Sequence, residues 1–350
     1  MLILESTVDH RLDSLGFSEF FAAAARDIAR PELLPARVAA DHGSAVRLLG
    51  ADPAPFTAPA TADLCVGDWV LVDPPSAEAP ARVVLRLPRR TELVRQAAGA
   101  KTKRQAIAAN LDVVFIVTAM GGDLSPRRLE RYLAAVHASG ADPVIVVNKA
   151  DLDFSAALSV ERDLPPGVPV VVTSTLIDHG LDALRSHLGV GRTAGFVGSS
   201  GVGKSSLVNA LSGSQVMVTA GIRESDGKGC HTTTHRELRL LAHGVVVDTP
   251  GMRELALWSG EGLQAVFEDL EALAEACRFR DCAHENEPGC ALLDGIDDGT
   301  VDPERVQSWR KLREEVRRHE LRKDPVALRA SQRAFARQIK NTARIKKVRR

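Results

Sequence analysis

Two hydrophobic patterns divide the chain. From residue 106 onward, short apolar runs that are typical of buried strands alternate with segments of helical periodicity. The predicted strands are 113–118, 144–147, 170–173, 194–197 and 245–247, and helices are predicted over 127–138 and 203–212. Ser125 and Pro126 suit the start of the first helix, and Gly140 suits its end. Strands that alternate with helices predict a parallel α/β sheet.

The first third of the chain follows another pattern. Apolar positions between Leu12 and Phe21 predict one or two short helices, and a Pro-rich boundary follows. Short β-like runs come next, at 37–40, 45–49, 69–72 and 81–87, and this spacing favours a small β-barrel. Beyond residue 262 the pattern is helical. The chain therefore predicts a multidomain α/β protein with a helical lead-in (1–35), a β-domain (36–105), an α/β domain (106–261) and a helical domain (262–350).

Composition adds limits to this picture. With 350 residues and 45% hydrophobic content, the chain is long enough for two or three domains that each bury a core. No apolar run approaches the ~18 residues of a membrane span. The N-terminus lacks the basic segment and apolar core of a secretory signal. We expect a cytoplasmic protein that has no membrane partner.

Charge is balanced overall but segregated along the chain. The 45 basic residues equal the 45 acidic ones in number. Residues 321–350 nevertheless hold eleven Lys and Arg against the single acid Asp324, and a smaller basic cluster lies near residue 100. The cluster comprises Arg89, Arg90, Arg95, Lys101, Lys103 and Arg104, opposed by Glu92. A solvated helical face would explain a basic tail, but this excess favours an RNA partner.

A phosphate-binding loop is the strongest motif. Gly198-Ser199-Ser200-Gly201-Val202-Gly203-Lys204-Ser205 has the GxxxxGK pattern followed by Ser, and it lies between a predicted strand and a predicted helix. The backbone N–H groups of this loop and of the first helical turn, as far as Ser206, would bind phosphates. Lys204 would reach the β and γ phosphates as a catalytic residue, and Ser205 would bind Mg²⁺. A Gly/Ser-rich surface turn is the alternative.

The base is indicated by Asn148-Lys149-Ala150-Asp151 at the end of a buried strand. The Asp151 carboxylate can accept hydrogen bonds from N1–H and the 2-amino group of guanine, which adenine does not offer. Asn148 would brace the loop and approach the base edge, and the Lys149 stem would cover the base. Ser174 and Thr175 would contact guanine O6 through backbone N–H groups. The sequence therefore predicts a site for GTP and GDP.

Two segments resemble nucleotide switches. Asp248-Thr249-Pro250-Gly251 follows an apolar strand, so Asp248 can hold Mg²⁺ and the Gly251 N–H can sense the γ phosphate. The polar, Gly-rich segment 221–235 reads as the first switch, with Thr233 as its Mg²⁺ ligand, or else as a surface loop without a nucleotide role. The guanine motif precedes the phosphate loop along the chain. This order predicts a circularly permuted GTPase domain whose second switch leads directly into residues 262–350.

Three of the five cysteines fall close to a histidine. The spacing is Cys277-x4-Cys282-x-His284-x5-Cys290. Disulfides are disfavoured in the cytoplasm, so three thiolates and one imidazole predict one closed, structural Zn²⁺ site. Unpaired buried thiols are the alternative. Cys65 and Cys230 stand apart and are read as ordinary thiols.

The permuted motif order, the leading β-domain and the cysteine spacing together resemble the RsgA family of small-subunit-dependent GTPases. The segments 107–112, 127–133 and 231–238 add to this resemblance, which covers nearly the whole chain. It implies an OB-fold, a permuted GTPase domain and a zinc-binding helical domain. It also implies activation by the 30S ribosomal subunit during late maturation, with 16S rRNA as the contact.

The resemblance also bears on catalysis. Met252 stands where many GTPases carry a glutamine that orients water, and the family points to His231 as the catalytic residue instead. A polar loop residue is the alternative for His231. Two other functions stay open, namely an RNA-binding assembly chaperone with a static nucleotide and a translation-factor GTPase dependent on 50S or 70S particles. We expect a monomer that does not bind DNA.

Overall fold

The computed structural model describes residues 10–61, 63–76, 79–96, 104–160, 167–213, 236–248, 255, 257 and 260–323. The chain forms two compact units. The first comprises Met1–Gln96 and Arg104–Ala256, and the second comprises Ala97–Lys103 and Leu257–Arg350. We describe each unit separately.

A parallel sheet is the centre of the first unit. Its strands lie in the order β10 (Val170–Val172), β9 (Asp142–Asn148), β8 (Val113–Ala119), β11 (Thr193–Gly198) and β13 (Gly244–Asp248). All four strand pairs are parallel. These are the five strands predicted from the apolar runs. The guanine motif, the phosphate loop and Asp248 lie at the carboxyl ends of β9, β11 and β13. The predicted nucleotide-binding residues therefore lie at the same end of the parallel strands.

One edge of this sheet departs from the prediction. Strand β12 (Glu237–Leu241) pairs with β13 in antiparallel register, and Glu237 lies opposite Asp248. The parallel pairing predicted for the five strands is confirmed, and β12 is an antiparallel strand that the sequence analysis did not predict. Because β12 and β13 are joined by the short turn 242–243, they form a hairpin, which can only be antiparallel.

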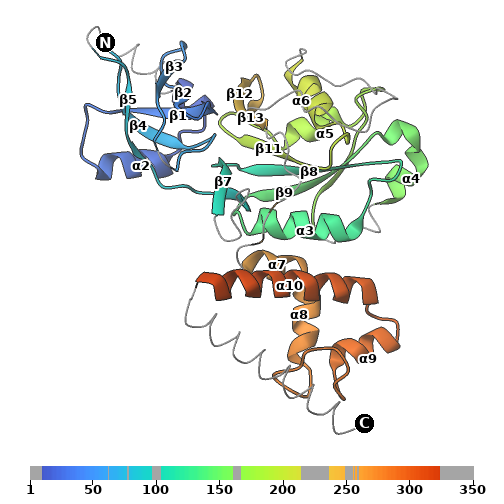
Figure 1. Cartoon of the computed structure of the whole chain (residues 1–350). Coiled ribbons are helices and arrows are strands. Elements are labelled where there is room, and N and C mark those ends of the chain that lie inside the picture. The colour runs from blue at the N-terminus through green and yellow to red at the C-terminus, as the bar shows by residue number, and fades with distance from the viewer. Residues whose placement is uncertain are drawn as a thin grey trace. The chain divides into compact units, whose positions relative to one another are not determined.

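Helices cover both faces of the parallel sheet (Figure 1). Helix α3 (Pro126–His137) lies on one face, and α5 (Leu181–Ser186) and α6 (Lys204–Ser212) lie on the other. Two shorter helices follow β9, namely η1 (Ala150–Leu152) and α4 (Phe154–Ser159). The core on the α5 and α6 face includes Phe115, Phe196 and Leu207. Ser125 is the N-cap residue of α3 as predicted, although its side chain makes no capping hydrogen bond.

The N-terminal part contains more strands than the four predicted. Five antiparallel strands lie in the order β3 (Phe56–Pro59), β2 (Ala45–Leu49), β1 (Leu34–Asp41), β4 (Trp69–Asp73) and β5 (Arg82–Arg86). Strands β6 (Glu92–Gln96) and β7 (Arg104–Ala109) form a separate pair. Residues 10–14 and α2 (Glu19–Asp27) supply the two predicted helices. The expected limit between residues 105 and 106 falls inside β7.

Strand β1 joins the two sheets, because Ala40 pairs with Glu237 of β12. A fully buried arginine, Arg37, holds the same junction. Its guanidinium donates to the carbonyl of Leu15, to Thr193 Oγ1 at 2.8 Å and to the Asn110 carbonyl at 3.0 Å. Burial lowers the pKa of Arg37 to about 10, so the side chain stays charged and needs these acceptors. The β-domain is thereby fixed to the first residue of β11, the strand that leads to the phosphate loop.

The second unit is helical, as expected. Its helices are α7 (Glu261–Val266), α8 (Glu268–Glu275), α9 (Ala291–Asp297) and α10 (Pro303–Lys323). Trp309 of α10 is fully buried, and its Nε1 donates to Glu271 Oε1 of α8 at 2.8 Å. Within the part of the chain that the structure describes, no helix is both long and apolar enough to cross a membrane. Most of the basic tail, beyond residue 323, lies outside the described residues.

Candidate nucleotide site and metal cluster

The phosphate loop lies between β11 and α6, where the motif predicted it. Gly198 (φ +140°) and Gly203 (φ +96°) have positive φ values that favour glycine. A Cβ on Gly198 would lie 2.1 Å from the Val117 carbonyl oxygen, and one on Gly203 would lie 2.2 Å from Asn148 Nδ2. These two glycines therefore let the loop turn tightly against β8 and β9.

Lys204 begins α6 and folds back over the loop. Its Nζ donates to the carbonyls of Gly198 at 2.9 Å and Ser199 at 2.5 Å. Ser205 and Ser206 follow in the first helical turn and are half-buried. The helix N-terminus and the lysine thus converge on one concave loop, an arrangement suited to binding phosphate.

Asn148 connects the guanine motif with the phosphate loop. The residue ends β9 and is almost fully buried. Its Nδ2 donates to the Val202 carbonyl at 2.8 Å, and its Oδ1 accepts from Thr173 Oγ1 at 3.1 Å. The predicted bracing role therefore has a direct contact. Three segments that are distant in sequence meet at this side chain.

The base-reading residues lie next to Asn148. Lys149 adopts the left-handed region (φ +58°) and turns the chain into η1, where Asp151 is exposed. The buried Ser174 donates through Oγ to Asp151 Oδ1, and its backbone N–H donates to the His179 carbonyl at 3.1 Å. Thr175 is exposed beside it. The structure thus brings the two predicted guanine segments together, while the Ser174 N–H is already engaged within the loop.

Asp248 ends β13 at the same edge of the sheet. Burial raises the pKa of its carboxyl to about 6, although the charges of Arg239 and Lys204 act in the opposite direction. A carboxylate held in such surroundings gains from a cation. Three other predicted residues, His231, Thr233 and Gly251, lie outside the described residues, and so do Met252 and Cys230.

The four predicted metal ligands converge in the second unit. The ligand atoms of Cys277, Cys282, His284 and Cys290 all lie within 4.8 Å of one another. Sγ of Cys277 and Sγ of Cys290 are 3.9 Å apart, and each is 3.5 Å from His284 Nδ1. Tetrahedral Zn²⁺ with ordinary bond lengths would give edges of about 3.8 Å between sulfurs and about 3.6 Å from sulfur to nitrogen. The cluster therefore fits such an ion.

Two side chains hold this cluster, and sequence reasoning missed the first of them. The Glu287 carboxylate accepts from the backbone N–H groups of Glu285, Asn286 and Ala283, and these bonds lower its pKa to about 2. The His284 ring lies 5.3 Å from the Trp309 ring, centroid to centroid. An acid within the Cys/His spacing was the only available sequence signal for Glu287, and it resembled an ordinary surface charge.

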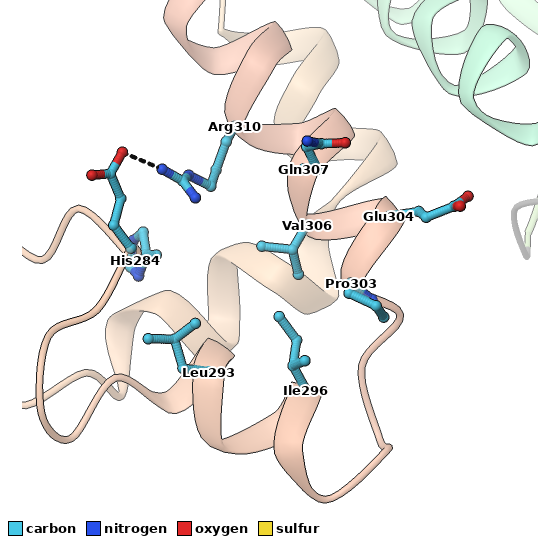
Figure 2. A pocket seen from close by; sticks show the side chains of 9 residues that line it. His284, Leu293, Ile296, Pro303, Glu304, Val306, Gln307 and Arg310 are labelled. Carbon is cyan, nitrogen blue, oxygen red and sulfur yellow. Dashed lines mark hydrogen bonds and ion pairs between the residues drawn. The ribbon is translucent and has the colours of Figure 1, made fainter.

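A hollow of about 330 Å³ lies beside the cluster and shares His284 with it (Figure 2). Its lining includes Leu293 and Ile296 of α9 and Val306 of α10. Arg310 and Glu285 also line it and form an ion pair. The hollow thus has both apolar and charged lining residues.

The basic cluster near residue 100 is only partly a free surface. Arg89 is largely buried and pairs with Asp68 and Glu92. Arg90 lies 3.4 Å from Asp112. Arg89 therefore stabilises the β-domain and is no exposed contact for RNA. The isolated Cys65 is buried, and burial raises the pKa of its thiol, as fits an inert residue.

Several known proteins that are similar to this chain carry names from one family. Residues 86–258 match the pattern of the family described as RsgA GTPase. A Methanosarcina acetivorans protein named "Small ribosomal subunit biogenesis GTPase RsgA" is 51% identical over 72% of this chain and 69% of its own. A protein of the same name from Opitutus terrae is 43% identical over 91% of this chain and 93% of its own.

Solved structures agree with this grouping. The crystal structure of YjeQ from Thermotoga maritima has a TM-score of 0.59 and 25% identity, covering 81% of this chain and 98% of that one. YloQ, described as a circularly permuted GTPase, has a TM-score of 0.57 and 24% identity, covering 81% and 95%. The resemblance inferred from the motifs is confirmed. With a phosphate loop that follows its guanine motif along the chain, and relatives alike over most of its length, this chain belongs to the RsgA GTPase family.

Proposed function

We propose that this chain is a GTPase that binds the 30S ribosomal subunit, assists its late maturation and hydrolyses GTP to GDP and phosphate under stimulation by the subunit. The carrying observation is the Asn148 side chain, which joins the guanine motif, Thr173 and the phosphate loop into one site. Relatives named for small ribosomal subunit biogenesis support the choice of subunit.

We assign the nucleotide to the carboxyl ends of the parallel strands. Asp151 accepts from guanine N1–H and the 2-amino group, and the Lys149 stem covers the base. Because the Ser174 N–H is engaged with His179, the Thr175 N–H is the one that we assign to guanine O6. The loop from Gly198 to Ser206 binds the phosphates through its N–H groups and Lys204.

Mg²⁺ fits the oxygen donors near this loop. We assign Ser205 and Thr233 as its protein ligands, Asp248 as the carboxylate that holds it through water, and the Gly251 N–H as the contact to the γ phosphate. The bound ion would neutralise charge on the phosphates. Burial raises the pKa of the half-buried Asp248, and a bound cation would oppose that shift by favouring the charged carboxylate.

Water activation is assigned to His231. Met252 has no group that can orient water, so another residue must do so. An imidazole next to the threonine run of the first switch can accept a hydrogen bond from the attacking water once the switch is ordered. The subunit would supply that order.

The remaining domains are assigned to binding. The five antiparallel strands of the β-domain support an OB-fold, which commonly contacts RNA. The Cys277, Cys282, His284 and Cys290 cluster holds one structural Zn²⁺, and the basic tail contacts 16S rRNA. We propose a cytoplasmic monomer with domain limits at 1–35, 36–105, 106–261 and 262–350.

The testing experiment measures GTP hydrolysis by the purified chain alone and with 30S, 50S or 70S particles, at fixed Mg²⁺ and salt. Strong stimulation by 30S alone is expected. Stimulation by 50S or 70S would instead indicate a translation-factor GTPase. Binding without any turnover would indicate an assembly chaperone with a static nucleotide.

Two variants separate chemistry from binding. Lys204→Ala should abolish hydrolysis, because the lysine contacts the phosphates directly. His231→Ala should preserve GTP binding and lower turnover stimulated by 30S by about 10²-fold. A stimulated rate equal to that of the wild type in the histidine variant would remove His231 from the mechanism.

A further inference from the structure

The two halves of the phosphate loop are held by different elements. On the C-terminal side, Val202 is buried and its carbonyl accepts from Asn148. On the N-terminal side, Ser200 and Gly201 are exposed, and a Cβ on Gly201 would have no atom within 4 Å. Gly198 begins the loop buried against β8, but the exposed residues after Ser199 have little packing of their own and need another support.

Arg128, in the first turn of α3, provides a contact on that side. Its Nη1 donates to Ser199 Oγ at 2.7 Å and to Asp123 Oδ1 at 2.5 Å. Asp123 is itself held, because Thr118 Oγ1 at the end of β8 donates to its carbonyl at 3.1 Å. The guanidinium thus bridges the β8–α3 connection and the phosphate loop.

Ser199 also contacts Lys204. Its carbonyl accepts from Lys204 Nζ at 2.5 Å while its hydroxyl accepts from Arg128. In loops of this kind the lysine reaches the β and γ phosphates. The residue that Arg128 fixes therefore lies at the end of the loop that meets the transferred phosphate.

We propose that Arg128 is a positioning residue for GTP hydrolysis, which acts through Ser199 to fix the N-terminal half of the phosphate loop. The proposal rests on the nucleotide site proposed above and adds a residue that the motifs do not include. Preorganised loop groups favour the transition state more than the ground state. Loss of Arg128 therefore lowers the rate of turnover more than the affinity for GDP.

A solvated ion pair is the competing explanation, and it has a different signature. The Arg128 side chain is 43% exposed and that of Asp123 is 24% exposed. Exposed pairs contribute little to stability. If Arg128 were only such a pair, its removal would leave both the melting temperature and turnover unchanged.

The test compares single-turnover GTP hydrolysis and GDP affinity in Arg128→Ala, Arg128→Lys and the wild type. A charged hydrogen bond of this kind predicts a rate about tenfold lower in Arg128→Ala, with an unchanged melting temperature and a GDP affinity within about twofold. Both bonds come from one nitrogen, Nη1, and an ammonium group has three donors. Arg128→Lys should therefore recover most of the rate.

Arg192→Ala is the matched control. Arg192 is 44% exposed and pairs with Asp142 at 3.5 Å, at the opposite end of the strands of the same sheet. This variant removes the same charge from the same unit and should leave turnover unchanged. An equal loss of rate in this control would make the effect one of net charge and would overturn the proposal.

A double variant tests the route through Ser199. Ser199→Ala should slow turnover about as much as Arg128→Ala, and the double variant should be no slower than either. Additive losses, or a rate in Arg128→Ala equal to that of the wild type, would overturn the proposal. If the wild type bound no guanine nucleotide, the proposed function would fail first and this inference with it.

Discussion

The nucleotide site and the Cys/His cluster have different kinds of support. The nucleotide residues follow strands β9, β11 and β13, which lie over a continuous apolar core. The cluster residues lie in the connection between α8 and α9, and Glu287 and Trp309 are the main groups that hold it. The first site therefore lies over a hydrophobic core, whereas the second lies in a connection between helices, where a bound metal ion would add support.

Removal of the metal should have the largest effect, and that effect should be confined to the second unit. A chelator should unfold the second unit, because structural Zn²⁺ contributes roughly 10–16 kcal/mol of apparent free energy in small domains. Nucleotide affinity should stay unchanged, since the first unit has its own core. Circular dichroism and GDP binding on one sample check both. Cys65→Ala should keep one Zn²⁺ per chain, and Zn²⁺ loss in that control would contradict the assigned ligands.

Asp151→Asn gives the next largest effect, confined to the nucleotide site. The carboxamide replaces one acceptor with a donor that faces the N1–H and 2-amino donors of guanine. GTP affinity should fall by about 10⁴-fold, as in other sites that depend on hydrogen bonds. Titration with GTP and xanthosine triphosphate measures the change, with the latter gaining. Asp153→Asn is the control, since Asp153 only caps α4 and Asn caps equally well.

Asn148→Ala tests how far the preformed site relies on one side chain. The change leaves the Val202 carbonyl and the Thr173 hydroxyl without their partner in a buried place. Unfolding free energy of the first unit should fall by about 1–3 kcal/mol, and GTP affinity by about tenfold. Denaturant unfolding and nucleotide titration measure the two. A stable variant with weaker GTP binding would mean that Asn148 serves the base alone.

Trp309→Phe should give the smallest effect, a small loss of stability in the second unit, which holds the Cys/His cluster. Phenylalanine keeps a ring beside His284 but loses the Nε1 bond to Glu271, which should cost about 1 kcal/mol. Thermal unfolding of the second unit measures it, with Zn²⁺ content as a second reading. Glu271→Gln keeps an acceptor and should cost less. An equal cost in both variants would indicate that the charge of Glu271 matters more than the bond.

The contacts between segments explain what sequence reasoning missed. Strands β3, β6, β7 and β12 were not predicted, and each is defined by its pairing partner more than by its own pattern. Arg37 and Arg128 resembled ordinary surface cations. One is fully buried among carbonyls and the other contacts the phosphate loop, and both contacts join residues more than 70 positions apart.

Local chemistry explains what the sequence determined by itself. The glycine spacing of the phosphate loop, the NKxD carboxylate and the Cys/His spacing each need particular residue types at fixed short intervals, so they are readable from the sequence. Their permuted order is readable in the same way. Which side chains hold those motifs in place depends on long-range packing. Only the tertiary structure could therefore decide that Arg37 is buried against the first residue of β11, that β1 pairs with β12 and that Arg128 contacts the phosphate loop.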